Sequence, residues 1–276
     1  MCKVGRVEDI ELTGVKQTLK VVLQTKAVDN QLPEPILGDT YAEQVMRKLD
    51  PDYDKRKGGT SQMGMLAVMR AKVHDDWARA YLADHPDAVV AHLGCGLDAR
   101  AYRVDPPATV EWYDLDFADV IELRRRLLPP RDHYHLIGSS VTELSWLDQI
   151  PRGRPVVMIA EGLLPYLPAA DVKALITTIV DEFPTGQIQC DIVPPWVART
   201  SKYDPNLRKL DITFQSGFAS PRVLADWRPG LEFVDEADVS HPAQLAQAPV
   251  LVRLTYAMMN ALPFMRRSYR VARYRF

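Results

Sequence analysis

Two glycines that follow a short apolar run could bring a flat ligand close to the backbone. In His92-Leu93-Gly94-Cys95-Gly96 the glycines stand two residues apart. Glycine lets the chain turn sharply and lets a ligand approach where a side chain would exclude it. Turns after strands also use glycine for geometry alone, and the full G-x-G-x-x-G dinucleotide pattern is absent. The glycine pair therefore leaves open both a cofactor site and a simple turn.

An acidic residue stands roughly 20 residues further along, where nucleotide-binding sheets place one against the ribose hydroxyls. Asp116 ends the run Tyr113-Asp114-Leu115-Asp116. The alternative is that Asp116 or Asp119 begins the helix predicted in FADVIELRRRLL, a role that needs no ligand. One of the two acids could contact a nucleoside while the other caps the helix.

A carboxylate and a guanidinium lie in otherwise apolar segments. Glu161 ends the run PVVMIAEG, and a buried carboxylate needs a cation or several donors. Arg70 stands four residues after Leu66 and three before Val73, which puts it on the apolar face of a predicted helix. It could hold a ligand carboxylate in bidentate fashion or pair with an acid such as Glu161.

The elements that must position these residues alternate between strand and helix patterns from about Val89 onward. This alternation predicts an α/β fold with a seven-stranded, mostly parallel sheet, whose ligands bind at the carboxyl ends of the strands. The candidate strands are residues 88–96, 109–116, 133–140, 155–162, 186–193, 231–239 and 269–276. Apolar residues at helical spacing over 172–183 and 251–265 predict two of the helices.

The remaining segments suggest one domain of 276 residues in four parts. Residues 1–87 form an N-terminal helical cover, with helices predicted over 15–27, 41–49 and 61–82, and residues 88–193 form the sheet core. A proline-rich insertion over 194–230 is expected to carry substrate contacts. Residues 231–276 supply the last strands and a helix.

Composition argues against several classes of partner. Lys and Arg total 34 against 36 Asp and Glu, so the net charge of -2 favours neither nucleic acid nor anionic membranes. Cys2, Cys95 and Cys190 are widely spaced, which favours a cytoplasmic protein without disulfides or a metal site. No signal segment or long apolar run is present. The basic, aromatic end over 266–276 could be a binding tail, but its alternation favours a closing strand.

Taken together, these segments resemble the leucine carboxyl methyltransferase family, in particular its bacterial branch of tetracenomycin-type polyketide O-methyltransferases. The resemblance rests on residues 12–19, 92–104, 112–129, 139–147, 159–167 and 273–276. It implies a class I methyltransferase sheet of the Rossmann-like kind, an N-terminal helical lid and an insertion after the fifth strand. It also implies S-adenosylmethionine as the cofactor and S-adenosylhomocysteine as the product.

The resemblance assigns roles to individual residues. Arg70 would hold the methionine carboxylate, Asp116 would bind the ribose, and Glu161 would line the methionine end of the site. The turn residues Gly94, Cys95 and Gly96 would lie against the cofactor. Three further residues are implied as cofactor contacts but match the family pattern less closely: Lys20, Ser140 and Val141.

The implied reaction is an in-line displacement that requires the acceptor to be held close to the methyl carbon. A carboxylic acid with a pKa of about 4 is already ionised and needs no base, whereas a phenol with a pKa of about 10 would benefit from one, and His74 is the candidate. The expected substrate is a small-molecule carboxylic acid of secondary metabolism. A phenol, a protein C-terminal carboxylate, an inactive S-adenosyl-binding protein and a nicotinamide oxidoreductase are the alternatives.

Residues of the insertion and of the 159–167 segment could orient the acceptor, although they could equally serve ordinary packing. They combine one guanidinium with aromatic rings, which suits an organic acid. The candidates are Tyr166 and Arg199, with Trp196, Tyr203 and Phe214.

Overall fold

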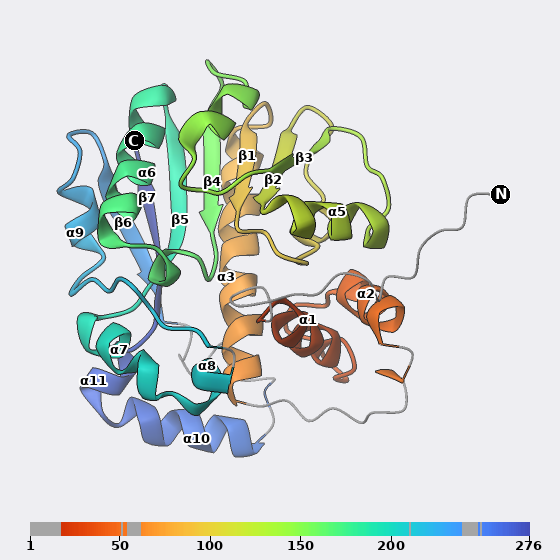
Figure 1. Ribbon diagram of the computed structural model, residues 1–276, viewed down its shortest axis with the longest axis vertical. Coiled ribbons are helices and arrows are strands. Elements are labelled where there is room, and N and C mark those ends of the chain that lie inside the picture. The colour runs from red at the N-terminus through yellow and green to blue at the C-terminus, as the bar shows by residue number, and fades with distance from the viewer. Residues whose placement is uncertain (1–17, 51, 54–61, 210, 239–247, 249) are drawn as a thin grey trace.

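A seven-stranded sheet forms the centre of the protein, seen in a computed structural model that describes residues 18–50, 52–53, 62–209, 211–238, 248 and 250–276 (Figure 1). The strands lie in the order β3-β2-β1-β4-β5-β7-β6. Their bounds are β1 Val89–Leu93, β2 Glu111–Asp116, β3 Tyr134–Gly138, β4 Val156–Ala160, β5 Gly186–Ile192, β6 Glu232–Ala237 and β7 Arg270–Arg275.

The first five strands are parallel, and β7 runs antiparallel between β5 and β6. Every residue of β1, β4 and β5 is buried, as expected for strands covered by helices on both faces. All seven predicted strands are confirmed. The C-terminal segment is a strand paired on both sides, so the prediction of a closing strand is also confirmed.

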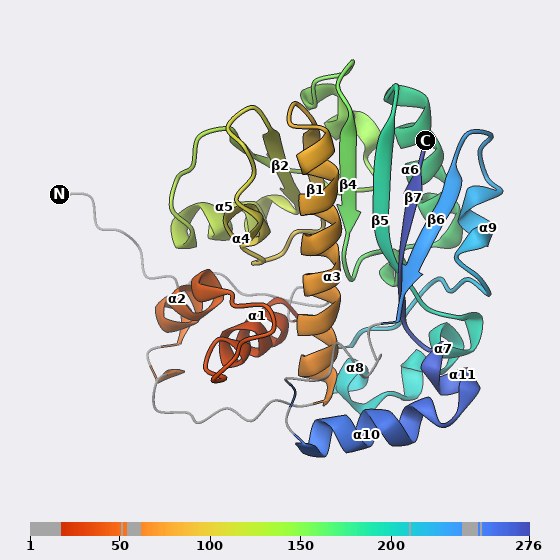
Figure 2. The same ribbon diagram turned by 180° about the vertical axis from the view of Figure 1, so that it is seen from behind.

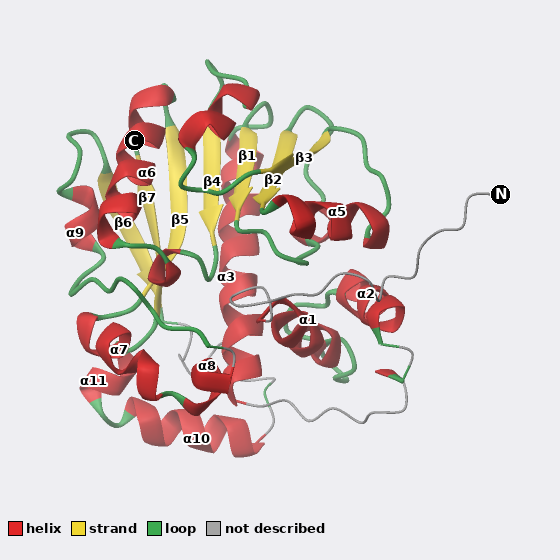
Figure 3. Cartoon of the chain, viewed as in Figure 1, coloured by secondary structure: helices red, strands yellow, loops and turns green. Residues whose placement is uncertain are grey.

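Helices cover both faces of the sheet. Figure 2 shows the long helix α3 crossing one face, while α6 lies on the other, and Figure 3 shows the strands between the two helical layers. The helices are α1 Thr18–Asp29, α2 Thr40–Leu49, α3 Gln62–Asp84, α4 Arg100–Val104, α5 Ala118–Leu127, α6 Ala169–Glu182, α7 Pro195–Thr200, α8 Pro205–Lys209, α9 Arg222–Ala225, α10 Val250–Asn260 and α11 Pro263–Arg266.

The N-terminal helices lie beside the carboxyl ends of the central strands (Figure 1). Asp39 caps α2 by accepting a hydrogen bond of 2.9 Å from the Ala42 amide, which satisfies one of the free donors at the helix start. Leu23 of α1 packs in one apolar cluster with Leu97 and with Leu127 of α5. The helical cover is therefore fastened to the sheet layer by its apolar face. The predicted helix positions 15–17 and 61 lie outside the described residues.

The predicted C-terminal helix is present as α10 and α11, but much of its apolar repeat faces outward. Leu251 and Met258 are 77% and 75% exposed, whereas Val252 and Tyr256 form the buried face. The helix is apolar on more than one side, so spacing alone does not select the side that packs. Within the described part of the chain, no helix has the length and apolar character needed to cross a membrane.

Candidate functional site

The glycine turn lies at the carboxyl end of β1, at the centre of the sheet. Gly94 and Gly96 have φ values of 60° and 51°, in the left-handed region that glycine adopts at little cost. The amide of Cys95 donates to the carbonyl of Leu115 over 3.2 Å, which ties the turn to β2. The turn is thus held where the ends of two neighbouring parallel strands meet.

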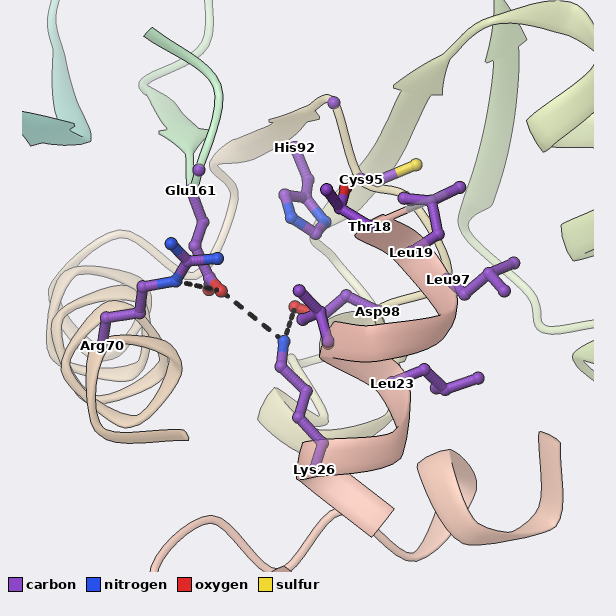
Figure 4. A pocket seen from close by; sticks show the side chains of 14 residues that line it. Thr18, Leu19, Leu23, Lys26, Arg70, His92, Cys95, Leu97, Asp98 and Glu161 are labelled. Carbon is purple, nitrogen blue, oxygen red and sulfur yellow. Dashed lines mark hydrogen bonds and ion pairs between the residues drawn. The ribbon is translucent and has the colours of Figure 1, made fainter. Parts of the chain in front are cut away.

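A cavity of about 80 Å³ lies against this turn (Figure 4). The turn, Arg70 of α3, Glu161 after β4, and α1 all contribute to its wall. Cofactor pockets commonly measure roughly 300–1,000 Å³, so this space is small. Helix α1 closes one side of the cavity and lies tight against the turn, since the Leu19 Cδ2 atom is 2.5 Å from where a Cβ on Gly96 would stand.

Glu161 is the negative centre of the cavity, and three cations surround its buried side chain. Its carboxylate pairs with Arg70 Nε at 3.0 Å, with Lys26 Nζ at 3.6 Å, and with Arg100. Burial by itself raises the pKa of Glu161, but Lys26, Arg100 and Arg70 together hold this pKa well below its usual range. Glu161 is therefore ionised at neutral pH.

Lys26 is the cation that α1 brings to the cavity. Its side chain is 1% exposed, and its ammonium lies 2.9 Å from a carboxylate oxygen of Asp98. Figure 4 shows Lys26 between Asp98 and Glu161, with Arg70 on the opposite side of Glu161. A buried ammonium needs such partners because its desolvation is costly. The lysine therefore fastens α1 to both acidic side chains.

A second layer of charges lies behind the cavity. Asp75 of α3 accepts from Arg100 Nε and from Arg103 Nε, each at 2.7 Å. Burial raises the pKa of Asp75, but Arg103 and Arg100 outweigh it and lower this pKa overall. Arg103 also donates to Asp98 over 2.6 Å. This network holds Asp98 and the helix that follows the glycine turn in place.

Asp116 is joined directly to the glycine turn. It accepts from the Gly96 amide and from the Phe117 amide, each at 2.8 Å. Burial raises its pKa above the ordinary value despite these two donors. Helix α5 begins at Ala118, and Asp119 lies in its first turn. The structure thus separates the two acids: Asp116 lies at the turn, and Asp119 lies on the helix.

His92 and Asp114 form a buried pair beneath the turn. Their side chains meet at 3.1 Å, and Asp114 also accepts from Arg124, whose Nη1 donates to the carbonyl of Gly96 over 2.7 Å. Burial, reinforced by Arg100, lowers the pKa of His92. His92 is therefore neutral at physiological pH, and the pair supports the turn from below.

Most predicted cofactor contacts lie together. The cavity is lined by Arg70, Gly94, Cys95, Gly96 and Glu161, and Asp116 is hydrogen-bonded to the same turn.

Three other predicted contacts lie elsewhere in the described structure. Lys20 is exposed on α1, while Ser140 and Val141 follow β3 and do not line the cavity.

His74 occupies a different place from the one predicted for a base. It is fully buried, with its Nε2 3.0 Å from Asp191 and its Nδ1 3.2 Å from the Gln189 side chain. His74 shares the helix face of Arg70, but it lies one turn further along α3, where its partners are side chains of β5. His74 does not line the cavity.

The predicted acceptor contacts are only partly brought together. Tyr166 and Phe214 meet edge to face, with ring centroids 5.2 Å apart, and Trp196 packs in the same way against Phe264 at 5.9 Å. Arg199 and Tyr203 are exposed.

Sequence reasoning missed two charged residues that line the cavity, Lys26 and Asp98, and one that lies behind it, Arg100. A signal existed for Lys26, because Leu19, Leu23 and Lys26 follow one another at intervals of four and three and so share one helix face. Nothing in the local pattern distinguishes Asp98 and Arg100 from ordinary residues of a turn.

The charges suit a ligand that carries both an ammonium and a carboxylate. Glu161 can face the cation, while Arg70 and Lys26 can face the anion. Asp116 adds an acceptor for hydroxyl groups at the adjoining strand end. The residues present therefore fit the amino acid and ribose parts of S-adenosylmethionine.

Comparisons with known proteins agree with this arrangement. The sequence profile of the leucine carboxyl methyltransferase family matches residues 16–180. The tetracenomycin polyketide synthesis O-methyltransferase TcmP of Streptomyces glaucescens is 45% identical over 269 residues, which cover 98% of this chain and 99% of the relative. The S-adenosyl-L-methionine-dependent methyltransferase dpfgK of Gibberella zeae is 30% identical and covers 84% of this chain and 85% of its own.

Solved structures share the fold at low sequence identity. A Thermobifida fusca protein assigned as a methyltransferase has a TM-score of 0.56 at 14% identity, over 91% of this chain and 93% of that one. A DUF574 family protein from Streptomyces avermitilis has a TM-score of 0.54 at 13% identity, over 91% and 96% of the two chains. By its profile match and its close relatives, the chain belongs to the leucine carboxyl methyltransferase family.

Proposed function

We propose that the protein transfers a methyl group from S-adenosylmethionine to a carboxylate oxygen of a small organic acid, with a polyketide as the expected class. Membership of the family makes the chain an S-adenosylmethionine-dependent O-methyltransferase. The further step to a carboxylate and a polyketide is our inference. A relative named for tetracenomycin polyketide synthesis supports the polyketide part.

The observation that carries the proposal is the cavity in which an ionised Glu161 and the guanidinium of Arg70 face the glycine turn. Arg70 would hold the methionine carboxylate, Glu161 the ammonium, and Asp116 the ribose hydroxyls. The bound cofactor supplies a methyl carbon attached to a sulfonium. Glycine at positions 94 and 96 leaves the backbone free of side chains on the side of the cofactor.

The titratable groups at the cavity support a carboxylate acceptor. Glu161 and Asp98 have pKa values held well below the usual range, so both are weak bases. Burial lowers the pKa of His92, which is bonded to Asp114, and raises that of Cys95 well above its ordinary value. Glu161 and Asp98 are held in ion pairs, and the His92 ring is buried between Asp114 and Arg100, so none of these three side chains is placed to take a phenolic proton. A carboxylate needs no such group.

In the proposed step, an acceptor carboxylate oxygen forms a bond to the methyl carbon as the carbon–sulfur bond breaks. The sulfonium becomes a thioether, the acceptor becomes an ester, and no proton moves. The protein's task is to hold the acceptor in line and to exclude water. Tyr166, which follows β4, and Phe214 of the 194–230 insertion meet edge to face and are our candidates for the aromatic side of the acceptor site.

The test begins with calorimetric titration of the purified protein with S-adenosylmethionine, S-adenosylhomocysteine and NAD. We expect S-adenosyl binding and none by NAD. Methyl-labelled cofactor is then supplied with aromatic polyketide carboxylic acids, the matching carboxamides and simple phenols. Labelled product that releases methanol in mild base indicates an ester.

Three other results of this experiment would each support a different function. A base-stable labelled product from phenols would indicate an aryl ether and overturn the carboxylate assignment. Label on peptides with a free C-terminal carboxylate, but not on small acids, would move the acceptor to proteins. Tight S-adenosyl binding with no transfer to any of the acceptors would favour an inactive binding protein.

A further inference from the structure

Arg70 is held by two anchors that come from distant parts of the chain. Its Nε donates to Glu161 over 3.0 Å, and its Nη1 donates to the hydroxyl of Tyr269 over 2.6 Å. Tyr269 directly precedes β7, which begins at Arg270. The C-terminal strand pairs with β5, and this pairing delivers the hydroxyl to the carboxyl ends of the parallel strands. The second anchor exists because β7 enters the sheet at that position.

The hydroxyl of Tyr269 has a fixed direction because of Asp191. It donates to Asp191 over 2.6 Å, and the same carboxylate accepts from the Gly162 amide and lies 3.0 Å from His74 Nε2. Burial raises the pKa of Tyr269 well above its ordinary value. The phenol therefore keeps its proton for Asp191 and offers its lone pair to Arg70.

These contacts leave part of the guanidinium available to the cavity. An arginine side chain has five N–H donors, of which Glu161 and Tyr269 engage two. In the described part of the structure, Nη2 makes no hydrogen bond, and Arg70 lines the cavity. The two anchors fix the plane of the guanidinium while leaving donors for a ligand carboxylate.

We propose that Tyr269 is a positioning residue of the cofactor site, which acts through Arg70 and orients the guanidinium toward the methionine carboxylate of the cofactor. The inference rests on the proposed function, because it presupposes that the cavity binds an S-adenosyl compound. Asp191 holds the tyrosine hydroxyl, His74 in turn holds Asp191, and neither His74 nor Asp191 lines the cavity. This gives the buried His74–Asp191 pair a purpose other than base catalysis.

The test compares two ligands that differ in the methionine carboxylate. S-adenosylhomocysteine carries the amino acid part, whereas 5′-methylthioadenosine lacks it and keeps the nucleoside and the sulfur. In Tyr269→Phe, calorimetry should show binding of S-adenosylhomocysteine weakened about tenfold, the loss expected for one hydrogen bond that orients a charged group. Affinity for 5′-methylthioadenosine should stay within about twofold of the wild type.

Tyr274→Phe provides a matched control. Tyr274 is a buried tyrosine within β7, and its hydroxyl donates to the Pro221 carbonyl over 2.8 Å, away from the cavity. This variant should leave the affinity ratio of the two ligands unchanged. In an Arg70→Ala background, Tyr269→Phe should cause no further loss, because the tyrosine acts only through that arginine.

The possible results separate the two hypotheses. An unchanged ratio in Tyr269→Phe, or an equal loss for both ligands, would overturn the positioning role while leaving the proposed function intact. An additive loss in the Arg70→Ala background would also overturn it. Wild-type protein that binds neither ligand would overturn the proposed function itself, and the inference would fall with it.

Discussion

At the residue scale, Asp116 and Asp119 stand three positions apart and take different places. Asp116 accepts from the Gly96 amide beside the cavity, while Asp119 lies in the first turn of α5. If Asp116 holds the ribose, Asp116→Ala should weaken binding by ~1.5–3 kcal/mol, the range for hydrogen bonds to a charged group. This corresponds to a loss of roughly 10- to 150-fold in affinity, measured by calorimetry.

The same loss should apply to S-adenosylhomocysteine and to 5′-methylthioadenosine, since both contain the ribose. Asp119→Ala is the control and should leave both affinities unchanged. An Asp116→Ala variant with wild-type affinity for both ligands would remove the ribose assignment.

At the element scale, the fit of α1 against the glycine turn depends on Gly96. A Cβ at this position would lie 2.5 Å from Leu19 Cδ2, and φ is 51°. Gly96→Ala should therefore push α1 away from the turn and lower the free energy of unfolding by more than the ~1 kcal/mol expected for a left-handed backbone alone. Urea denaturation measures this difference.

Gly38→Ala separates clash from backbone strain. Gly38 has a φ of 69°, and a Cβ there would meet nothing within 4 Å. Gly38→Ala should therefore lower the free energy of unfolding only by the ~1 kcal/mol expected for a left-handed backbone. Adding Leu19→Ala to Gly96→Ala should recover part of the stability that Gly96→Ala loses. Equal losses in Gly38→Ala and Gly96→Ala would show that α1 does not press against the turn.

At the scale of the whole molecule, buried ionised acids should make stability sensitive to low pH. The buried acids with lowered pKa values are Asp75, Asp98, Asp114, Glu161 and Asp191. Burial raises the pKa of Asp114, but Arg124 and the hydrogen bonds outweigh it and bring this pKa to about 2. A lowered folded pKa means that stability is fully present above the unfolded pKa of ~4 and is lost as pH falls toward about 2.

Asp114 alone accounts for about 2 kcal/mol of this loss. Urea denaturation between pH 5 and pH 3 should show a falling free energy of unfolding in the wild type and a shallower fall in Asp114→Asn. Asp148→Asn, which removes an exposed partner of Arg152, should match the wild type within about 0.5 kcal/mol. Equal slopes for the wild type and Asp114→Asn would contradict the lowered pKa.

Much of the fold could be predicted because its signals are local. Short segments rich in β-branched residues predict strands, and the seven strands of the structure lie at the seven segments so predicted. The glycine turn, Asp116 and Glu161 each end such a run, so a parallel sheet brings them to one edge. The resemblance to the family then supplied the cofactor, which the residues alone left open.

The tertiary structure decided what spacing along the chain does not encode. Lys26 and Glu161 meet across the cavity, and Arg70 meets Tyr269 across 199 positions of sequence. The place of β7 between β5 and β6 depends on which sheet edge the chain returns to. Likewise, periodicity shows that α10 has apolar faces, but only packing selects Val252 over Leu251 for burial.

By itself, then, the sequence determined the elements, the edge of the sheet that carries the site, and the family. Only the tertiary structure decided that His74 is buried against Asp191 and that Lys26 and Tyr269 complete the environment of Glu161 and Arg70. The physical reason is that a local pattern shows only which face of an element is buried. The partners of a buried charge come from distant parts of the chain, and only the packing of the whole molecule brings them together.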